Sequence, residues 1–412
     1  MRTGISVLEA RAIVLEQARP LAPEVVAFEA ALGRVLAEDV RSSRTLPPAD
    51  CSAMDGYAVR AADVAAPGAQ LRIAYEVAAG AHAPRALAAG EAARIFTGAP
   101  LPPGADTVVR QEDTEARAGE VRVQVAVPRR ESVREAGEDV RAGDLVLEAS
   151  ARIGPPEVGM LAALGKTLVH VHRRPSVAVL SGGDELVEPH EEPTNGRIVS
   201  SNAYSIAAQC REAGSTPNNL GIARDTPGDL ERLLRAGLGA DVLVSSAGVS
   251  VGDHDHVRPT LEKLGVRLAF WGVEMKPGYP ITFGRADDGR GAFVFGLPGN
   301  PVSALVTFEL FVRPLLLALA GRSDLARPEV TAIAGEAFRK KPGREHYVRV
   351  FLAKRGDGWI ATTTGNQSSG VLRSMTLADG LLVFPAAASE IAAGARARVI
   401  VLDESVFARP AA

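Results

Sequence analysis

DVLVSSAGVSVGDHD, residues 241–255, gives the clearest indication of how the centre of this chain folds. Residues 242–244 form a short apolar run, which is typical of a strand buried on both faces of a sheet. The run opens into small residues, which let backbone amides and hydroxyls approach a ligand closely: Ser245, Ser246, Gly248, Ser250 and Gly252. Asp255 follows, and a carboxylate suits a hard metal ion. Because open α/β sheets bind ligands at the carboxyl ends of their strands, we predict a site here.

The residues around this stretch alternate between strand and helix patterns. Short apolar runs predict further strands at residues 176–180, 220–223 and 293–295. Helical spacing with capping signals predicts helices at residues 202–212, 225–237 and 258–264, and another from residue 302. This alternation predicts an α/β domain over residues 175–325, with a mostly parallel sheet covered by helices on both faces in three layers.

The regions on either side have a different texture. Residues 1–174 are predicted to form an elongated N-terminal region, with a helix at 6–17, a second helical stretch at 25–39 and a β-rich insert at about 50–145. Residues 326–412 are β-rich, and the segments 346–352 and 359–364 flank an Arg-Gly-Asp-Gly turn that is typical of a hairpin.

The composition narrows the class of protein. A chain of 412 residues with 46% hydrophobic and 23% charged residues is typical of a globular protein with several domains. The net charge of −3 argues against nucleic acid as a partner. No apolar run reaches membrane-spanning length, and the N-terminus lacks a signal pattern, so we expect neither a membrane protein nor a secreted one. Two cysteines fit a reducing cytoplasm.

Three more motifs fall at predicted strand ends or turns of the α/β domain. SGGDEL, residues 181–186, places Gly182, Gly183 and Glu185 after a strand. MKPGYP, residues 275–280, holds Lys276 on a stiff turn, where its ammonium can meet a phosphate. GLPGNP, residues 296–301, leads into a helix whose N-terminus suits an anion.

Each motif has an ordinary structural explanation when it is taken alone. Asp225, at the head of a helix, fits an N-cap, Lys276 fits an exposed surface lysine, and GLPGNP fits a connector. Together they predict a phosphate or oxyanion ligand with Mg²⁺, in a chain that lacks the GxGxxG and GxxxxGK[ST] fingerprints.

Three segments of the N-terminal half are also unusual. These are PPADCSAMDGYAVR at residues 47–60, IFTGAPLPPGADTVVR at 95–110 and SVREAGEDVRAGD at 132–144. The composition of the first two is also typical of ordinary loops, and that of the third, taken alone, favours a solvated charged face.

The set of motifs, in this order and spacing, closely resembles the molybdopterin molybdenumtransferase family, the molybdenum insertases that include MoeA and the E domain of gephyrin. The resemblance covers essentially the whole chain. It implies an elongated N-terminal region with an inserted β subdomain, a molybdopterin-binding α/β domain and a C-terminal β-barrel-like domain. It also implies a homodimer in which each active site is shared between the two subunits.

The reaction implied by the resemblance is the insertion of molybdenum from molybdate into adenylylated molybdopterin, with Mg²⁺ as the metal and release of AMP. A molybdopterin adenylyltransferase would act upstream. Cleavage of a phosphoanhydride depends on charge neutralisation and positioning more than on a covalent nucleophile, which fits the acids and the lysine of the motifs.

The resemblance assigns functional roles to particular residues. Glu185, Asp225 and Asp255 are expected to hold the metal or orient oxyanions, and Lys276 to bind phosphate or molybdate. The partner subunit would close the site with Asp55, Thr97, Arg134 and Asp139. Further substrate contacts are expected from Gly182, Gly183, Ser245, Ser246, Gly248, Ser250, Gly252, Pro298, Pro301, Arg349 and Ser369.

The chain departs from the family pattern at two cationic positions, where Gly272 and Tyr279 stand in place of frequent lysines. The alternatives are a molybdopterin adenylyltransferase, a tungsten-handling insertase and a binding scaffold without catalysis. The adenylyltransferase usually lacks the N-terminal and barrel regions, and the retained acids and Lys276 favour catalysis over a scaffold.

Overall fold

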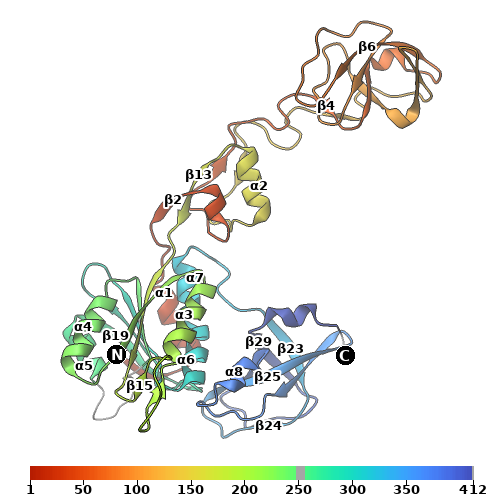
Figure 1. Cartoon of the computed structure of the whole chain (residues 1–412). Coiled ribbons are helices and arrows are strands. Elements are labelled where there is room, and N and C mark those ends of the chain that lie inside the picture. The colour runs from red at the N-terminus through yellow and green to blue at the C-terminus, as the bar shows by residue number, and fades with distance from the viewer. Residues whose placement is uncertain (247–255, 411–412) are drawn as a thin grey trace. The chain divides into compact units, whose positions relative to one another are not determined.

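A computed structural model describes residues 1–246 and 256–410 of the chain (Figure 1). These residues fall into two compact units, which are described separately below. Unit 1 comprises Met1–Val26, Ala31–Ala37 and His170–Ala412, and unit 2 comprises Ala27–Ala30 and Glu38–Val169.

A seven-stranded sheet forms the centre of unit 1. All neighbouring strands run parallel except β21, which is antiparallel to both of its neighbours. The strands, in their order across the sheet, are β1 (Arg2–Ile5), β19 (Val266–Val273), β21 (Thr282–Ala286), β22 (Phe293–Gly296), β18 (Val242–Ser245), β14 (Ser176–Gly182) and β17 (Thr216–Ala223). The predicted mostly parallel sheet is therefore confirmed.

Helices cover both faces of this sheet, as predicted (Figure 1). One face packs in a large hydrophobic core against α1 (Val7–Glu16), α3 (Asn202–Glu212), α6 (Pro301–Thr307) and α7 (Arg313–Leu319), with a π-helical turn η4 (Phe308–Val312) between the last two. The other face packs in a separate core against α4 (Pro227–Gly237) and α5 (Val257–Lys263). Burial on both faces explains why the strands read as continuous apolar runs.

The first residues of the chain belong to this sheet. Strand β1 pairs in parallel with β19, and α1 packs into the first core, so residues 1–26 lie in unit 1 although the sequence placed them in the N-terminal region. The second helix predicted at residues 25–39 was wrong. That segment holds β2 (Pro23–Ala27) and one short 3₁₀ turn, η1 (Phe28–Ala31).

The C-terminal part of unit 1 is a β-barrel, as the resemblance implied. Its strands follow the order β20 (Met275–Lys276), β25 (Glu345–Arg355), β26 (Gly358–Thr363), β23 (Glu329–Ala334), β29 (Arg396–Val401) and β27 (Gly380–Phe384), and pairing of β27 with β25 closes the barrel. The barrel core contains Val348, Val350 and Leu352 from alternate positions of β25. Strand β20 comes from the Lys276 turn of the α/β domain, so the barrel and the sheet are joined by main-chain pairing.

Unit 2 contains a six-stranded, mainly antiparallel sheet in the predicted β-rich insert. Its strands, in spatial order, are β8 (Thr107–Arg110), β5 (Gly56–Val59), β7 (Glu91–Ile95), β6 (Gln70–Val77), β10 (Glu120–Val123) and β9 (Thr114–Arg117). Gly56 of β5 is a position where only glycine fits, because an added Cβ would lie 1.9 Å from the carbonyl oxygen of Val109.

The remaining elements are short, apart from helix α2 (Pro155–Ala163) and strand β13 (Leu168–His172). They are η2 (Ala61–Asp63), η3 (Gln111–Asp113), η5 (Glu404–Ala408), α8 (Arg373–Thr376), β3 (Val40–Arg41), β4 (Cys51–Ser52), β11 (Val133–Arg134), β12 (Leu145–Leu147), β15 (Leu186–Val187), β16 (Ile198–Val199), β24 (Phe338–Arg339) and β28 (Glu390–Ile391).

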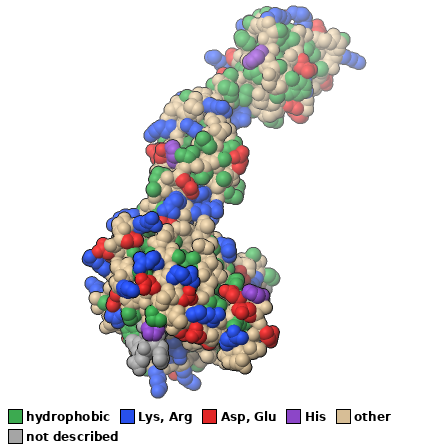
Figure 2. All heavy atoms as spheres, turned by 60° about the vertical axis from the view of Figure 1, so that its left-hand side comes forward, with side chains coloured by type: hydrophobic (Ala, Val, Ile, Leu, Met, Phe, Trp, Pro, Cys, Tyr) green, Lys and Arg blue, Asp and Glu red, His purple; other side chains and the backbone are tan. Residues whose placement is uncertain are grey.

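One helical segment of the described chain, Pro301–Leu319, is long and apolar enough to cross a membrane by length and composition. It is 83% buried inside the protein, as a core helix is. On the face shown in Figure 2, Lys and Arg side chains are interspersed with Asp and Glu side chains, in keeping with the small net charge.

Candidate active site

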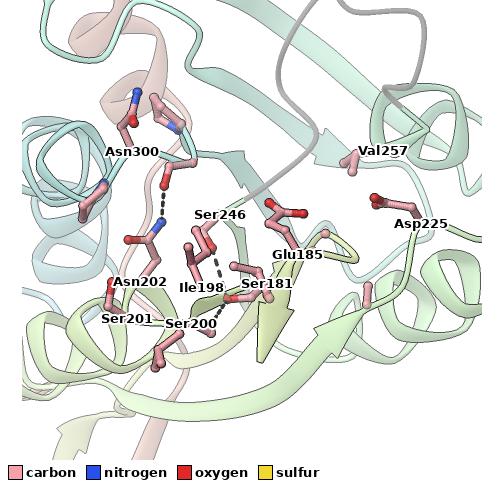
Figure 3. Close-up of a pocket in the computed structure, with 18 of the residues that line it drawn as sticks. Ser181, Glu185, Ile198, Ser200, Ser201, Asn202, Asp225, Ser246, Val257 and Asn300 are labelled. Carbon is pink, nitrogen blue, oxygen red and sulfur yellow. Dashed lines mark hydrogen bonds between the residues drawn. The ribbon is translucent and has the colours of Figure 1, made fainter. Parts of the chain in front are cut away.

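A cavity of about 800 Å³ lies at the carboxyl ends of the central strands (Figure 3). Its walls come from the residues that follow β14, β17, β18 and β22, including Gly182, Asp225, Ser246 and Pro298. These strands are parallel, so their ends meet at one edge of the sheet, where α/β folds bind ligands. We call this cavity the sheet-edge pocket.

Two carboxylates, of Glu185 and Asp225, point into the space between the loops that follow β14 and β17 (Figure 3). The loops are tied together by reciprocal bonds: the amide of Asp184 donates to Oδ2 of Asp225 at 3.2 Å, and the amide of Asp225 donates to Oδ1 of Asp184 at 3.2 Å. Within the described chain, the Glu185 carboxylate makes no hydrogen bond or ion pair with another side chain. The pair therefore keeps carboxylate oxygens available for a ligand.

Gly183 lets the Glu185 side chain turn back over the main chain. Its φ is +135°, a conformation that favours glycine, and an added Cβ would lie 2.3 Å from Oε2 of Glu185. The two glycines of SGGDEL thus serve a local geometry that places a carboxylate at the pocket.

Three serine hydroxyls form the buried end of the pocket. Ser181, Ser200 and Ser246 line it and are 0%, 3% and 4% exposed. Ser200 Oγ donates to Ser181 Oγ at 3.0 Å, and Ser181 Oγ lies 3.3 Å from Ser246 Oγ (Figure 3). The hydroxyls come from β14 and from the residues just after β16 and β18, so the fold assembles a group that is scattered in sequence.

Four helices begin at this pocket, and none has a side-chain hydrogen bond at its N-cap. The N-cap residues are Ser201 of α3, Thr226 of α4, His256 of α5 and Asn300 of α6. In contrast, α1 begins away from the pocket with a full capping box between Ser6 and Glu9. Without a side-chain cap, a helix N-terminus presents backbone N–H groups and the positive end of the helix dipole, which favours an anionic ligand. At α6 the Val302 amide already donates to the Ser369 carbonyl oxygen, so its contribution comes mainly from the dipole.

Asn202 does not cap α3; its side chain holds the GLPGNP loop. It is the first residue of α3, and its Nδ2 donates to the carbonyl oxygen of Gly299 at 2.7 Å (Figure 3). Asp225 likewise does not cap α4, whose N-cap is Thr226. Pro298 and Pro301 both line the pocket.

A second group of predicted residues lies where the Lys276 turn meets the barrel. Lys276 pairs with His346 in the β20–β25 ladder, and its exposed ammonium makes no hydrogen bond or ion pair with the described side chains. The backbone carbonyl oxygen of Ser369 accepts a hydrogen bond from the amide of Val302 in the first turn of α6, beside Pro301 of the pocket. We call Lys276, His346, Arg349 and Ser369 the junction cluster.

Arg349 is a buried cation without a carboxylate partner in the described structure. It is 0% exposed, and its Nε and Nη2 donate to Ser374 Oγ at 3.2 Å and to the Ser368 carbonyl at 3.3 Å, while Nη1 has no partner. Burial lowers the pKa of Arg349 to about 10. An uncompensated buried charge is unfavourable, so an anion next to it would be stabilised.

His346 is neutral in this surrounding. Burial, followed by repulsion from Lys276 and Arg349, lowers the pKa of His346 to about 4. Its buried Nε2 also lacks a hydrogen-bond partner in the described part of the chain.

Gly272 and Tyr279, which stand where relatives frequently have lysine, contact each other. Gly272 has φ +78°, and an added Cβ would lie 3.3 Å from Cζ of Tyr279. The Tyr279 ring in turn carries the Arg344 guanidinium 3.9 Å above its centroid, and Arg344 Nε donates to Glu274 Oε2 at 3.1 Å. Gly272 thus leaves room for the ring, and the ring positions a cation at this turn.

The predicted residues of the N-terminal half lie in unit 2. The amide and hydroxyl of Thr97 both donate to Asp55 Oδ1 at 2.8 Å, and these two bonds lower the pKa of Asp55. Arg134 lies on β11, 3.7 Å from Glu138, and the amide of Asp139 donates to the Leu46 carbonyl at 3.1 Å. The charged run is anchored by Asp50, which accepts from Arg130 at 2.6 Å and from the Ala136 amide at 2.9 Å.

The structure thus gathers part of the predicted set around the sheet-edge pocket. The predicted residues that line it are Gly182, Gly183, Glu185, Asp225, Ser246, Pro298 and Pro301. Ser245 is 1% exposed inside β18. The predicted residues Gly248, Ser250, Gly252 and Asp255 lie outside the described residues.

Several residues that line the pocket belong to no motif that could be recognised in the sequence. Ile198 and Val199 form an apolar wall, and Ser200 and Asn202 contribute polar groups from a segment that reads only as the approach to a helix. The pairing of β15 with β16 brings these residues to the pocket. This pairing could not be predicted from the sequence, because a polar loop of ten residues separates the two strands.

Comparisons with known proteins show the family to which the chain belongs. Family models match residues 5–165 as MoeA N-terminal region (domain I and II), 178–318 as probable molybdopterin binding domain and 331–402 as MoeA C-terminal region (domain IV). A relative from Nostoc sp. named molybdopterin molybdenumtransferase is 38% identical over 90% of this chain and 87% of its own. The chain belongs to the molybdopterin molybdenumtransferase family.

Other members of the molybdopterin molybdenumtransferase family match over nearly the full length. The relative of the same name from Haemophilus influenzae is 35% identical over 94% of this chain and 96% of its own. The crystal structure of a molybdopterin biosynthesis MoeA protein from Pyrococcus horikoshii superposes with a TM-score of 0.82 at 32% identity, covering 97% of this chain and 99% of that chain.

Proposed function

We propose that this protein is a molybdopterin molybdenumtransferase that inserts molybdenum from molybdate into adenylylated molybdopterin and releases AMP. The observation that carries the proposal is a set of charged groups without partners among the described residues: the Glu185 carboxylate at the sheet-edge pocket, and the Lys276 ammonium and Nη1 of Arg349 in the junction cluster. Folded proteins rarely leave a buried polar group unpaired, so the buried Nη1 of Arg349 in particular supports an anionic ligand. The names of relatives that match over most of the chain support the same reaction.

The sheet-edge pocket is the proposed site of the adenylylated molybdopterin. A phosphoanhydride placed between the loops would meet the N-termini of α3 and α6, whose helix dipoles stabilise negative charge, and α3 lacks a side-chain cap on its first N–H groups. Its cleavage would depend on position and on charge neutralisation more than on a covalent nucleophile.

Mg²⁺ fits the donor set of this pocket. Glu185 and Asp225 supply carboxylate oxygens from two loops that reciprocal bonds hold together, and Mg²⁺ prefers such oxygens. Among the described residues no group of three His, Cys, Asp or Glu converges, and we propose Asp255, which lies outside them, as the third ligand. A bound Mg²⁺ would neutralise phosphate charge while the protein fixes the geometry of the anhydride.

Molybdate is the proposed ligand of the junction cluster. Lys276 provides a mobile ammonium, and Arg349 provides a guanidinium whose charge the protein does not compensate. A tetrahedral dianion would pair with both, and Ser369 would contribute a hydroxyl from the loop that contacts the first turn of α6. Tungstate has the same shape and charge, so competition between the two anions would measure the choice of metal.

The main experiment measures AMP release from adenylylated molybdopterin by the full chain in the presence of molybdate and Mg²⁺. We expect Glu185→Gln to lower the rate at least about 100-fold, because it removes one charge from the proposed metal site without changing side-chain volume. Chelation of Mg²⁺ should abolish AMP release by the unaltered protein.

A matched control is Glu192→Gln, which removes an exposed carboxylate from the connection between β15 and β16, whereas Glu185 lies just before β15. It should retain the rate of the unaltered protein. Absence of AMP release by the unaltered protein, or equal rates for Glu185→Gln and Glu192→Gln, would contradict the proposed function.

We also propose a cytoplasmic homodimer whose site is completed across subunits by Asp55, Thr97, Arg134 and Asp139. Free, buried Cys51 and Cys210 support a reducing compartment.

Complementation tests the shared site: Asp55→Asn and Glu185→Gln should each be inactive, and a refolded mixture should regain up to about a quarter of the activity from mixed dimers. A mixture that stays inactive while its subunits exchange would contradict the shared site. The molybdopterin adenylyltransferase is the proposed upstream partner.

A further inference from the structure

The serine hydroxyls at the buried end of the sheet-edge pocket form an ordered chain. Ser200 donates to Ser181, and Ser181 is fully buried with one other partner, the hydroxyl of Ser246. A buried hydroxyl proton without an acceptor is unfavourable, so the Ser181 hydroxyl donates a hydrogen bond to the Ser246 hydroxyl.

This direction leaves the Ser246 proton without an acceptor in the described chain. The amide of Ser246 is already committed to the Leu180 carbonyl at 2.9 Å. The hydroxyl accepts from Ser181, and Ser246 lines the cavity, so a ligand in the cavity can accept its proton. A hydroxyl that accepts one hydrogen bond becomes a stronger donor, because chains of hydrogen bonds polarise one another.

We infer that Ser181 and Ser200 are positioning residues that orient the Ser246 hydroxyl as a donor to an uncharged acceptor on the heterocycle of the substrate, such as a ring carbonyl. The inference rests on the proposed function, and it adds the orientation of the substrate: the heterocycle enters the buried end and the anionic groups remain near Glu185 and Asp225. Those two carboxylates belong to exposed or half-exposed residues, whereas the three serines are buried.

The surroundings of the three serines favour an uncharged ring over a phosphate. Ile198, Val199 and Val257 offer apolar contact for a flat ring in the same cavity. Arg224, the arginine among the described lining residues, is exposed, and its Nη1 donates to the Leu186 carbonyl at 3.2 Å. Among the described lining residues no cationic side chain lies with the three buried serines, so a phosphate there would meet only the partial charge of the α3 N-terminus and would lack a full counter-charge.

The test is equilibrium dialysis of molybdopterin against the full-length protein, with the bound fraction measured as the fluorescent oxidation product. Ser246→Ala should raise the dissociation constant about three- to tenfold, the range of one neutral hydrogen bond. Ser246→Thr keeps the hydroxyl and should bind within about twofold of the unaltered protein. Ser181→Ala should weaken binding about two- to threefold, because Ser246 loses the bond that orients it.

A double variant separates orientation from a general effect on the fold. If Ser181 acts through Ser246, Ser181→Ala should add no further loss in the Ser246→Ala background. The matched control is Ser215→Ala, which removes another buried serine hydroxyl of the same domain, one without a hydrogen-bond partner and outside the pocket lining. It should bind molybdopterin as the unaltered protein does.

Unchanged affinity in Ser246→Ala would overturn the inference, and so would additive losses in the double variant. AMP binding should be the same in all variants, and a loss for AMP instead of molybdopterin would assign the acceptor to the nucleotide and also overturn it. Failure of the proposed function looks different: the unaltered protein would bind molybdopterin with the pattern above yet release no AMP from the adenylylated form.

Discussion

Two buried arginines of unit 1 show how this protein separates stability from ligand binding. Arg327, near the end of α7, donates to Glu309 at 3.0 Å and to Glu212 at 2.7 Å, and these partners raise its pKa against the effect of burial. Arg349, in the junction cluster, has no carboxylate partner in the described structure, and burial lowers its pKa. The same side chain is therefore matched by the protein in one place and left for an external anion in the other.

The same contrast recurs among carboxylates and helix ends. Asp241, at the start of β18, accepts two hydrogen bonds from Arg173 and two from Ser176, whereas Glu185 beyond the other end of the sheet has no such partners among described residues. Helix α1 is capped, whereas the helices that begin at the sheet-edge pocket are not. Among the described residues, Arg327 and Asp241 thus have charged partners that stabilise the fold, whereas Arg349 and Glu185 have none and belong to the proposed site.

The largest expected effect contrasts the two arginines directly. Arg327→Met should lower the free energy of unfolding by about 3 kcal/mol or more, because Glu309, 8% exposed, loses its closest ion-pair partner. Arg349→Met should change it by less than about 1 kcal/mol or raise it, since no charged partner among the described residues is left behind. Urea unfolding followed by tryptophan fluorescence measures both, as Trp271 and Trp359 both lie in unit 1.

Activity should reverse this order. Arg349→Met should raise KM for molybdate at least about tenfold, the scale of one lost charge-assisted hydrogen bond. The folded fraction of Arg327→Met should have the same KM for molybdate as the unaltered protein. Equal destabilisation by the two substitutions would show that Arg349 is matched by the protein after all.

The pH dependence of stability gives the next largest effect, and it tests the surroundings of Arg349. The pKa of His346 is lowered to about 4 in the fold from its usual value near 6.5, so between these values the unfolded chain binds more protons. The stability that the neutral imidazole provides is complete above about pH 6.5 and is lost as pH falls toward 4, by up to about 3 kcal/mol.

His346→Gln should flatten the part of the urea stability profile that falls between pH 6.5 and pH 4. The exposed His82 provides the control, because His82→Gln should leave the profile unchanged. An unaltered slope in His346→Gln would mean that this histidine is not held neutral between Lys276 and Arg349.

The smallest expected effect concerns the helix ends. Ser6→Ala removes the bond that the Ser6 hydroxyl accepts from the Glu9 amide and the bond that it donates to Glu9 Oε2, and it should lower the free energy of unfolding by about 1 kcal/mol. Ser201→Ala should cost less than about 0.5 kcal/mol, because Ser201 makes no side-chain cap at α3. The tryptophan-monitored urea transition reports both, and similar losses would contradict the separation between capped helices and those at the pocket.

The sequence by itself determined the central architecture and the types of chemical group in the site. Apolar runs at β14, β18 and β22 and the small residues after them predict buried parallel strands with a ligand edge, because burial on both faces imposes a local pattern. It also determined the Ser6 cap of α1 and the hairpin of β25 and β26, since both depend on residues close together in the chain.

Only the tertiary structure decided which groups are left unmatched. The addition of β1 to β19, the pairing of β15 with β16 that brings Ser200 beside Ser181, and the burial of Arg349 without a counter-charge all join residues far apart in sequence. Local periodicity records how much of each residue is buried but not which partner it meets, because partner choice depends on long-range packing. Glu185 and Arg349, both proposed to bind metal or substrate, are two groups to which the packing of the described chain gave no ion-pair partner.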